Sequence, residues 1–219
     1  MGSVEKGASL MVLPSCLFDP SSPLVLDASV VINLNATGCA AQILTAIPNR
    51  IVVTDIVADE LDSGRAKGRT DADQLELLVS GLQIERVALS SIAEGHFLDL
   101  VAGSGASTLD DGEAATVAWA VAHGGIPIID DKKGIAICRN KFSFLMIGST
   151  TDLFYQREVR EAVNDFELAE ALYFALSIAR MRVPDHQLAW VVSIIGQERA
   201  ATCHSLPERA RNGFFATVK

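Results

Sequence analysis

The chain has 219 residues, of which 49% are apolar and 21% are charged, and its formal net charge is −9. This composition excludes a disordered chain and fits one folded domain with an extension, or two small domains. The acidic balance argues against binding of nucleic acid through a broad basic surface. It does not exclude a nuclease whose acids gather in one metal pocket, because bound cations offset those charges.

Apolar runs in the chain are of strand length, and none is long enough to span a bilayer, so we expect no membrane contact. The cysteines, at positions 16, 39, 138 and 203, form no CxxC pair and no Cys/His ligand spacing. That pattern argues against zinc and predicts a reduced, cytoplasmic setting. Residues 1–22 contain too short an apolar run for a signal segment and are interpreted as a partly flexible lead-in.

The first predicted element lies in the stretch Leu24–Asn33, where an apolar strand ends at Asp27 and turns at once into a helix. Further strands are predicted at 50–54, 84–89, 126–129 and 144–147. Helices are predicted between them, at 39–47, 56–61, 71–82, 92–101, 113–123 and 135–139. This alternation is typical of a parallel sheet with helices on both faces, and places an α/β domain at residues 23–150.

From residue 151 onward the pattern changes, and no further strand is predicted. Helices are predicted at 152–163, 166–182 and 185–196, and the polar tail from Ala201 is predicted to be loose. Residues 151–219 are therefore interpreted as a helical extension of the α/β domain.

Acidic residues recur at similar places in these elements, at Asp27, Glu60, Glu113 and the pair Asp130–Asp131. In a parallel sheet the carboxyl ends of the strands share one edge, which is where ligands bind. Carboxylates brought together there repel one another unless a cation lies between them. Oxygen-only ligands suit Mg²⁺ or Mn²⁺, and such a site favours metal-activated water attacking a phosphodiester.

Each acid also has a purely structural interpretation. Asp27 is a candidate turn residue before a helix, and Glu60 a solvated helix residue with Asp59 beside it. Asp110 and Glu113 have the D-x-x-E spacing of a capping box, and Asp130–Asp131 has the composition of a plain turn. No single acid is specific, and the metal hypothesis depends on their joint order.

Four motifs resemble those of the PIN-domain family of metal-dependent nucleases. The first is Leu26–Asn33, similar to the family's Asp-x-Ser/Asn opening. The second is Val53–Leu61, with Glu60 as its acid. The third is Leu109–Ala118, which resembles the Gly-Glu-Ala variant. The fourth is Ile128–Gly134. The nearest resemblance is to the VapC-type ribonuclease toxins of toxin–antitoxin pairs.

The resemblance implies a three-layer α/β/α domain that cleaves single-stranded RNA with Mg²⁺ or Mn²⁺. It implies that Asp27, Glu60, Glu113 and either Asp130 or Asp131 hold the metal, the choice within the last pair being open. Ser29 and Thr54 would support the site by hydrogen bonds. A small antitoxin protein and a second copy of the chain are the expected protein partners, and the extension is longer than a minimal toxin carries.

Cations for the RNA phosphates are expected in the glycine-punctuated loop after Glu60 and beside the fourth motif. The candidates are Arg65, Lys67, Arg69, Lys132 and Lys133. Arg180 and Arg182 in the extension are candidates for contact with a partner instead.

Two other functions compete with the nuclease. A PIN-like domain that has lost catalysis would serve as a protein- or RNA-binding module, and the net charge and the glutamate in the third motif favour it. A nucleotide-binding doubly wound domain is weaker, because neither a G-x-G-x-x-G sequence nor a P-loop follows the first strand.

Overall fold

The structure, a computed structural model, describes residues 19–102 and 108–213. Most of the predicted lead-in, the predicted loop at 103–107 and the end of the tail lie outside these residues. The centre is a four-stranded parallel sheet in the order β3-β2-β1-β4. The strands are β1 (Leu24–Leu26), β2 (Ile51–Thr54), β3 (Glu85–Val87) and β4 (Ile126–Ile128). The predicted α/β class is confirmed.

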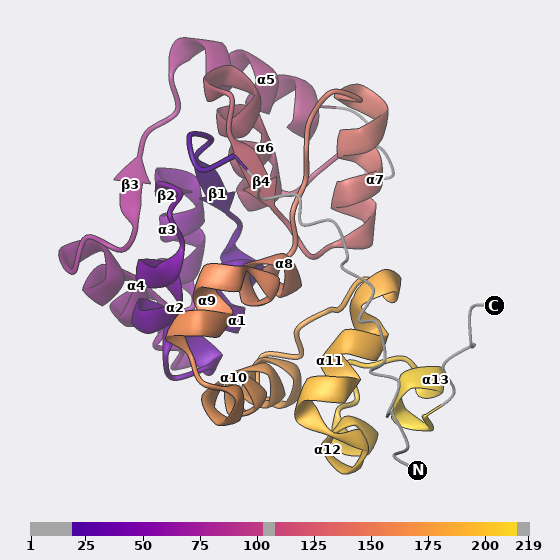
Figure 1. Ribbon diagram of the computed structural model, residues 1–219. Coiled ribbons are helices and arrows are strands. Elements are labelled where there is room, and N and C mark those ends of the chain that lie inside the picture. The colour runs from indigo at the N-terminus through magenta and orange to yellow at the C-terminus, as the bar shows by residue number, and fades with distance from the viewer. Residues whose placement is uncertain (1–18, 103–107, 214–219) are drawn as a thin grey trace, which may run out of the picture.

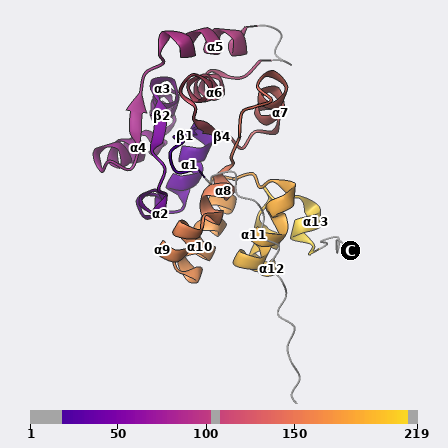
Figure 2. The same ribbon diagram turned by 45° about the horizontal axis from the view of Figure 1, so that its top comes forward.

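Both faces of β1, β2 and β4 are buried because these strands are continuous apolar runs whose side chains point to the two faces in turn. Leu24 and Leu26 of β1 join the main core, while Val25 between them packs on the opposite face with Trp119. Trp119 belongs to α6 (Asp111–His123), which lies on that second face with α5 (Ser91–Val101) beside it. Figures 1 and 2 show α5 and α6 on the side of the sheet away from the extension, while α7 (Lys132–Lys141) lies nearer to it.

The main core lies on the other face of the sheet. It includes apolar residues of α1 (Ala28–Ala36) and α2 (Ala40–Ala46). After β2 the chain forms α3 (Asp55–Ser63), the short helix η1 (Arg65–Lys67) and α4 (Asp71–Ser80).

The extension packs into this same core. Leu172 and Val191, both completely buried, belong to one apolar cluster with Leu24 and Leu26 of the central strand. Its elements are α8 (Thr150–Tyr155), α9 (Arg157–Ala162), α10 (Asp165–Ser177), η2 (Asp185–Gln187), α11 (Leu188–Ile195), α12 (Gln197–Thr202) and α13 (Glu208–Arg211). The extension therefore helps to bury the sheet, and removing it would expose apolar surface.

The predicted fifth strand at 144–147 is wrong. Among the described residues, this region contacts the sheet through one isolated bridge, between Gly148 and Ile128. Phe144 and Met146 are exposed, while Leu145 and Ile147 pack against the core beside α6. Exposed and partly buried side chains therefore alternate along this segment, as they do in a strand. The segment follows the edge of β4 without pairing along it.

The helices of the extension also differ from prediction. The predicted helix 152–163 is split, because Gln156 adopts an extended backbone between α8 and α9. The predicted helix 166–182 ends at Ser177, and the chain then turns through Arg180, whose φ is 59°. The tail from Ala201 is not loose as far as residue 213, since Cys203, Leu206 and Ala210 are buried.

Within the two described ranges, no single helix has both the length and the apolarity of a membrane span. Helices α1 and α2 meet those criteria only as a pair, and a bend of 114° separates them.

Candidate active site

Asp27 directly follows β1 and is the N-cap residue of α1. Its Oδ2 accepts hydrogen bonds from the Ser29 backbone N–H at 3.2 Å and from the Ser29 hydroxyl at 2.7 Å. The side chain is 5% exposed, and burial, followed by the charge of Asp110, raises its pKa. Ser29 thus supports the carboxylate, and Asp27 is both a helix cap and a buried acid at the carboxyl edge of the sheet.

Glu60 on α3 and Glu113 on α6 face this edge. Burial and then the charge of Asp27 raise the pKa of Glu60 to about 7. Burial, Asp110 and Asp27 raise the pKa of Glu113 to about 8. Both shifts have the same physical origin, since like charges in a partly desolvated site favour the neutral acid. The two glutamates and Asp27 therefore form one electrostatic cluster.

Two glycines let these carboxylates approach the backbone. A Cβ on Gly112 would press on the Glu60 carboxylate and would lie 3.6 Å from Asp27 Oδ1. A Cβ on Gly134, in the first turn of α7, would lie 2.9 Å from Glu113 Oε1. The first-turn glycine of α6 is therefore a spatial requirement of the acid cluster, and not only a feature of the motif.

Asp130 follows β4 and is held by three donors. Its Oδ1 accepts from the Thr150 backbone N–H at 2.8 Å, and its Oδ2 accepts from the Thr150 hydroxyl at 2.5 Å and from Asn33 Nδ2 at 2.7 Å. Burial nevertheless raises its pKa to about 6, with a smaller contribution from Asp27. Asp130 is therefore a fixed acid that faces Asp27.

Asp131 has a different environment. Its Oδ1 caps α7 by accepting from the backbone N–H groups of Lys133 and Gly134. Its Oδ2 pairs with Arg182 Nη1 at 2.9 Å, and its charge contributes to the raised pKa of Glu113. Both members of the pair therefore interact with the cluster electrostatically, Asp130 with Asp27 and Asp131 with Glu113.

The structure adds three contributors that local sequence patterns do not reveal. Asp110 raises the pKa of Asp27, Glu60 and Glu113, and Asp111 that of Glu60. The sequence pattern assigns Asp110 only to a capping box, of which the structure shows the Asp110 half, a bond from the Glu113 N–H at 2.9 Å. Because the first turn of α6 points at the acid edge, its cap necessarily lies in the site.

The third such contributor is Arg182. It lies 51 residues from Asp131, with which it pairs, and no local pattern predicts that meeting. The sequence suggests contact with a partner for Arg182, but the structure places its guanidinium on an acid of the site.

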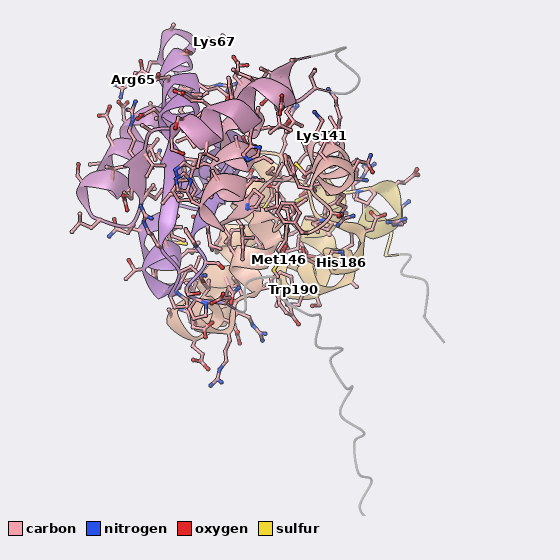
Figure 3. All side chains as sticks on the ribbon, turned by 90° about the horizontal axis from the view of Figure 1, so that it is seen from above. Arg65, Lys67, Lys141, Met146, His186 and Trp190 are labelled. Atoms are coloured by element: carbon pink, nitrogen blue, oxygen red, sulfur yellow. The ribbon has the colours of Figure 1, made fainter. Side chains whose placement is uncertain are left out.

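The remaining predicted residues are more dispersed. Thr54 is fully buried and caps α3 by accepting from the Val57 N–H at 3.3 Å. Arg65 forms ion pairs with the carboxylates of Asp62, Asp73 and Glu76. Figure 3 shows Arg65 and Lys67 together, well apart from His186.

Arg69 and Lys132 are exposed and line two separate cavities. Lys133, also exposed, begins α7 beside Asp131. The charge of Arg65 is thus already offset by three acids.

The donor set fits a hard divalent cation. Its ligands would be carboxylate oxygens, and the raised pKa values mark repulsion and burial that a divalent cation would relieve. In the part of the chain that the structure describes, no three Asp, Glu, His or Cys side chains are already spaced for a metal ion. Metal binding would therefore require the acid side chains to move closer together.

Comparison with known families supports the motif assignment. A family model described as a PIN domain (DUF3368) matches residues 23–149. No curated protein and no solved structure matches the chain. The matched region contains every predicted acid, while Arg182 and the rest of the extension lie outside it.

Proposed function

Because the chain belongs to the PIN-domain family, a family built on a nuclease fold, we propose that it is a metal-dependent ribonuclease that hydrolyses single-stranded RNA. The observation that carries the proposal is the meeting of Asp27, Glu60, Glu113 and the Asp130–Asp131 pair. These acids are distant in sequence and arrive from four different elements at one edge of the sheet. Burying so many like charges is unfavourable. A bound cation would offset their repulsion, so a cation-dependent activity would account for the cluster.

The proposed chemistry divides between the ion and the chain. Mg²⁺ or Mn²⁺ held by Asp27, Glu60, Glu113 and Asp130 or Asp131 would supply an activated water and stabilise charge on the phosphate. Ser29 fixes the rotamer of Asp27 through two hydrogen bonds. Asn33 and Thr150 hold Asp130 in place by hydrogen bonds, so the movement that brings ligands to an ion would come from the other acids.

A direct test is cleavage of a mixed single-stranded RNA pool with Mn²⁺, Mg²⁺ or EDTA, by the wild type and Asp27→Asn. Asparagine is as good a helix N-cap as aspartate, so this variant keeps the start of α1. The matched control is Asp59→Asn on α3, because Asp59 is exposed and pairs with Arg86. We expect metal-dependent cleavage by the wild type and the control, and none by Asp27→Asn. Equal cleavage by all three would refute the proposal.

A catalytically inactive binding module is the second candidate function. The ion pair between Arg182 and Asp131 favours it, since the chain then supplies its own cation to one acid. Calorimetric titration with Mn²⁺ separates the two candidates, because the nuclease must bind the ion and the module need not.

The biological role that the motif resemblance supports is that of the toxin of a toxin–antitoxin pair, acting in the cytoplasm and inhibited by a small antitoxin. Expression of the wild type, but not of Asp27→Asn, should then arrest growth of a bacterial host. Normal growth with active, soluble wild-type protein would contradict the toxin role.

A further inference from the structure

Three adjoining cavities lie along the boundary between the PIN domain and the extension. The first, about 680 Å³, is lined by Arg69 and Arg180, and the second, about 260 Å³, by Arg180, Asp130 and Asp131. The third, about 320 Å³, is lined by Asp130, Lys132 and Arg139. We call this set of cavities the extension groove.

Shared lining residues place the three cavities next to one another. Ile32, Ala179 and Arg180 line both the first and the second cavity. Asp130 and Arg182 line both the second and the third. The middle cavity is lined by Asp130 and Asp131 of the candidate active site, together with Ser29, so a chain molecule in the groove would pass these two acids and continue on either side.

Arg182 of the groove pairs with Asp131, but four other groove cations differ from most arginines of the protein. Arg50, Arg86, Arg157, Arg199 and Arg209 each pair with a carboxylate. Between residues 19 and 102 and between 108 and 213, no carboxylate lies within ion-pair distance of Arg69, Arg139, Arg180 or Lys132. In a chain with net charge −9, cations without acid partners on both sides of an acid site indicate an anionic ligand.

The extension forms one wall of this groove through a defined turn. Arg180 adopts a left-handed backbone, the Met181 N–H bonds to the Ala175 carbonyl at 2.9 Å, and Met181 is buried. Further along, Gln187 donates to buried Asp152 at 2.7 Å and so anchors the segment after Pro184 to α8. The wall is thus fixed in position and is not an open loop.

We propose that the extension groove holds the single-stranded RNA backbone, with Arg69 and Arg180 on one side of the acids and Lys132 and Arg139 on the other. This inference rests on the proposed function and assigns its substrate path. The apolar parts of the third cavity, Ile135, Ile147 and Pro184, give a base a surface to lie against. We expect the groove to bind RNA without sequence preference, because its cations contact phosphates and not the edges of bases.

The test measures RNA binding without catalysis. Anisotropy of a fluorescent single-stranded RNA pool is recorded in EDTA for the wild type, Arg139→Gln and Arg180→Asn, asparagine being tolerated in the left-handed region. We expect RNA binding to weaken about tenfold in each variant, because each loses one charge-assisted hydrogen bond to a phosphate. The slope of log K against log salt should fall by about 0.7 for each phosphate that a variant no longer neutralises.

Two further variants separate the groove from general surface charge. Ala136→Phe adds bulk at a position of α7 that lines the third cavity and changes no charge. It should weaken binding while leaving the salt slope unchanged. The control is Lys141→Gln, at the end of the same helix (Lys141 is labelled in Figure 3). Lys141 Nζ donates a hydrogen bond to the Asp99 carbonyl. This control should bind RNA like the wild type.

The outcomes distinguish this inference from the proposed function. Wild-type binding in EDTA that the groove variants weaken supports the groove even if no cleavage is found. Unchanged binding in Arg139→Gln and Ala136→Phe, or no wild-type binding, overturns the groove even if the protein is an active nuclease. Equal, variant-sensitive binding of polyglutamate would overturn it in favour of an acidic protein partner.

Discussion

Asn33 Nδ2 lies 2.7 Å from Asp130 Oδ2, a buried hydrogen bond between residues 97 positions apart. It joins α1, which follows the first strand, to the residue that follows the last one. The same amide lies 3.2 Å from the Thr150 hydroxyl at the start of the extension. One side chain therefore connects the first motif, the fourth motif and the extension.

Removal of this amide should destabilise the protein. Asn33→Ala leaves the buried Asp130 carboxylate without one donor, and we expect the free energy of unfolding to fall by about 1–3 kcal/mol. Urea denaturation measures the change. The control is Asn140→Ala on the exposed side of α7, which should have wild-type stability. Equal stability of Asn33→Ala and the wild type would show that this bond contributes nothing.

Gly112→Ala should damage the site without damaging the helix. The new Cβ would meet the Glu60 carboxylate, so we expect Mn²⁺ affinity to fall by about tenfold, a loss typical of disturbed ligand support. Calorimetric titration measures this affinity. The matched control is Gly95→Ala in α5, where a Cβ meets nothing within 4 Å and should stabilise the helix by about 1 kcal/mol. Unchanged Mn²⁺ affinity in Gly112→Ala would mean that Glu60 does not hold the ion.

Stability without metal should depend on pH in a defined direction. The pKa rises from 4.5 to about 8 for Glu113, from 4.5 to about 7 for Glu60 and from 3.8 to about 6 for Asp130. The folded protein therefore binds more protons than the unfolded chain from about pH 4 to pH 8. Its free energy of unfolding should fall as pH rises through that window.

Urea denaturation in EDTA across these pH values measures the effect. Glu113→Gln, which cannot ionise, should flatten the upper part of the curve. Mn²⁺ should bind more tightly as pH rises through the same window, because the ion competes with protons for the carboxylates. Stability that increases from pH 5 to pH 8 without metal would contradict the assigned shifts.

Arg182→Gln should strengthen metal binding. Arg182 is a cation beside Asp131, and its removal leaves the acid cluster more negative, so we expect Mn²⁺ affinity to rise severalfold. Arg209→Gln is the matched control, because it breaks a similar exposed pair with Asp185. A loss of Mn²⁺ affinity in Arg182→Gln, with the control unchanged, would instead show that the pair orients Asp131 for the ion.

The order of the elements could be predicted from the sequence because it follows from local patterns. The buried strands are continuous apolar runs, and their alternation with amphipathic helices specifies a parallel sheet. That sheet then has one carboxyl edge, which is why Asp27, Glu113 and Asp130 could be grouped while still far apart in sequence. The length of each element was less predictable, as the unpaired segment 144–147 shows. A strand forms only where a neighbouring strand pairs with it, and a local sequence pattern does not specify that pairing.

What only the tertiary structure decided is which distant side chains meet. Asp110 has the spacing of a helix cap, and its place among the acids depends on where α6 points. Arg182 reaches Asp131 because the chain turns at Arg180 after α10 ends, a result of packing across 51 residues. Local sequence specifies backbone preference and apolar faces. The positions of charges relative to one another depend on how the helices pack, and the extension that carries Arg182 shares one apolar core with the PIN domain.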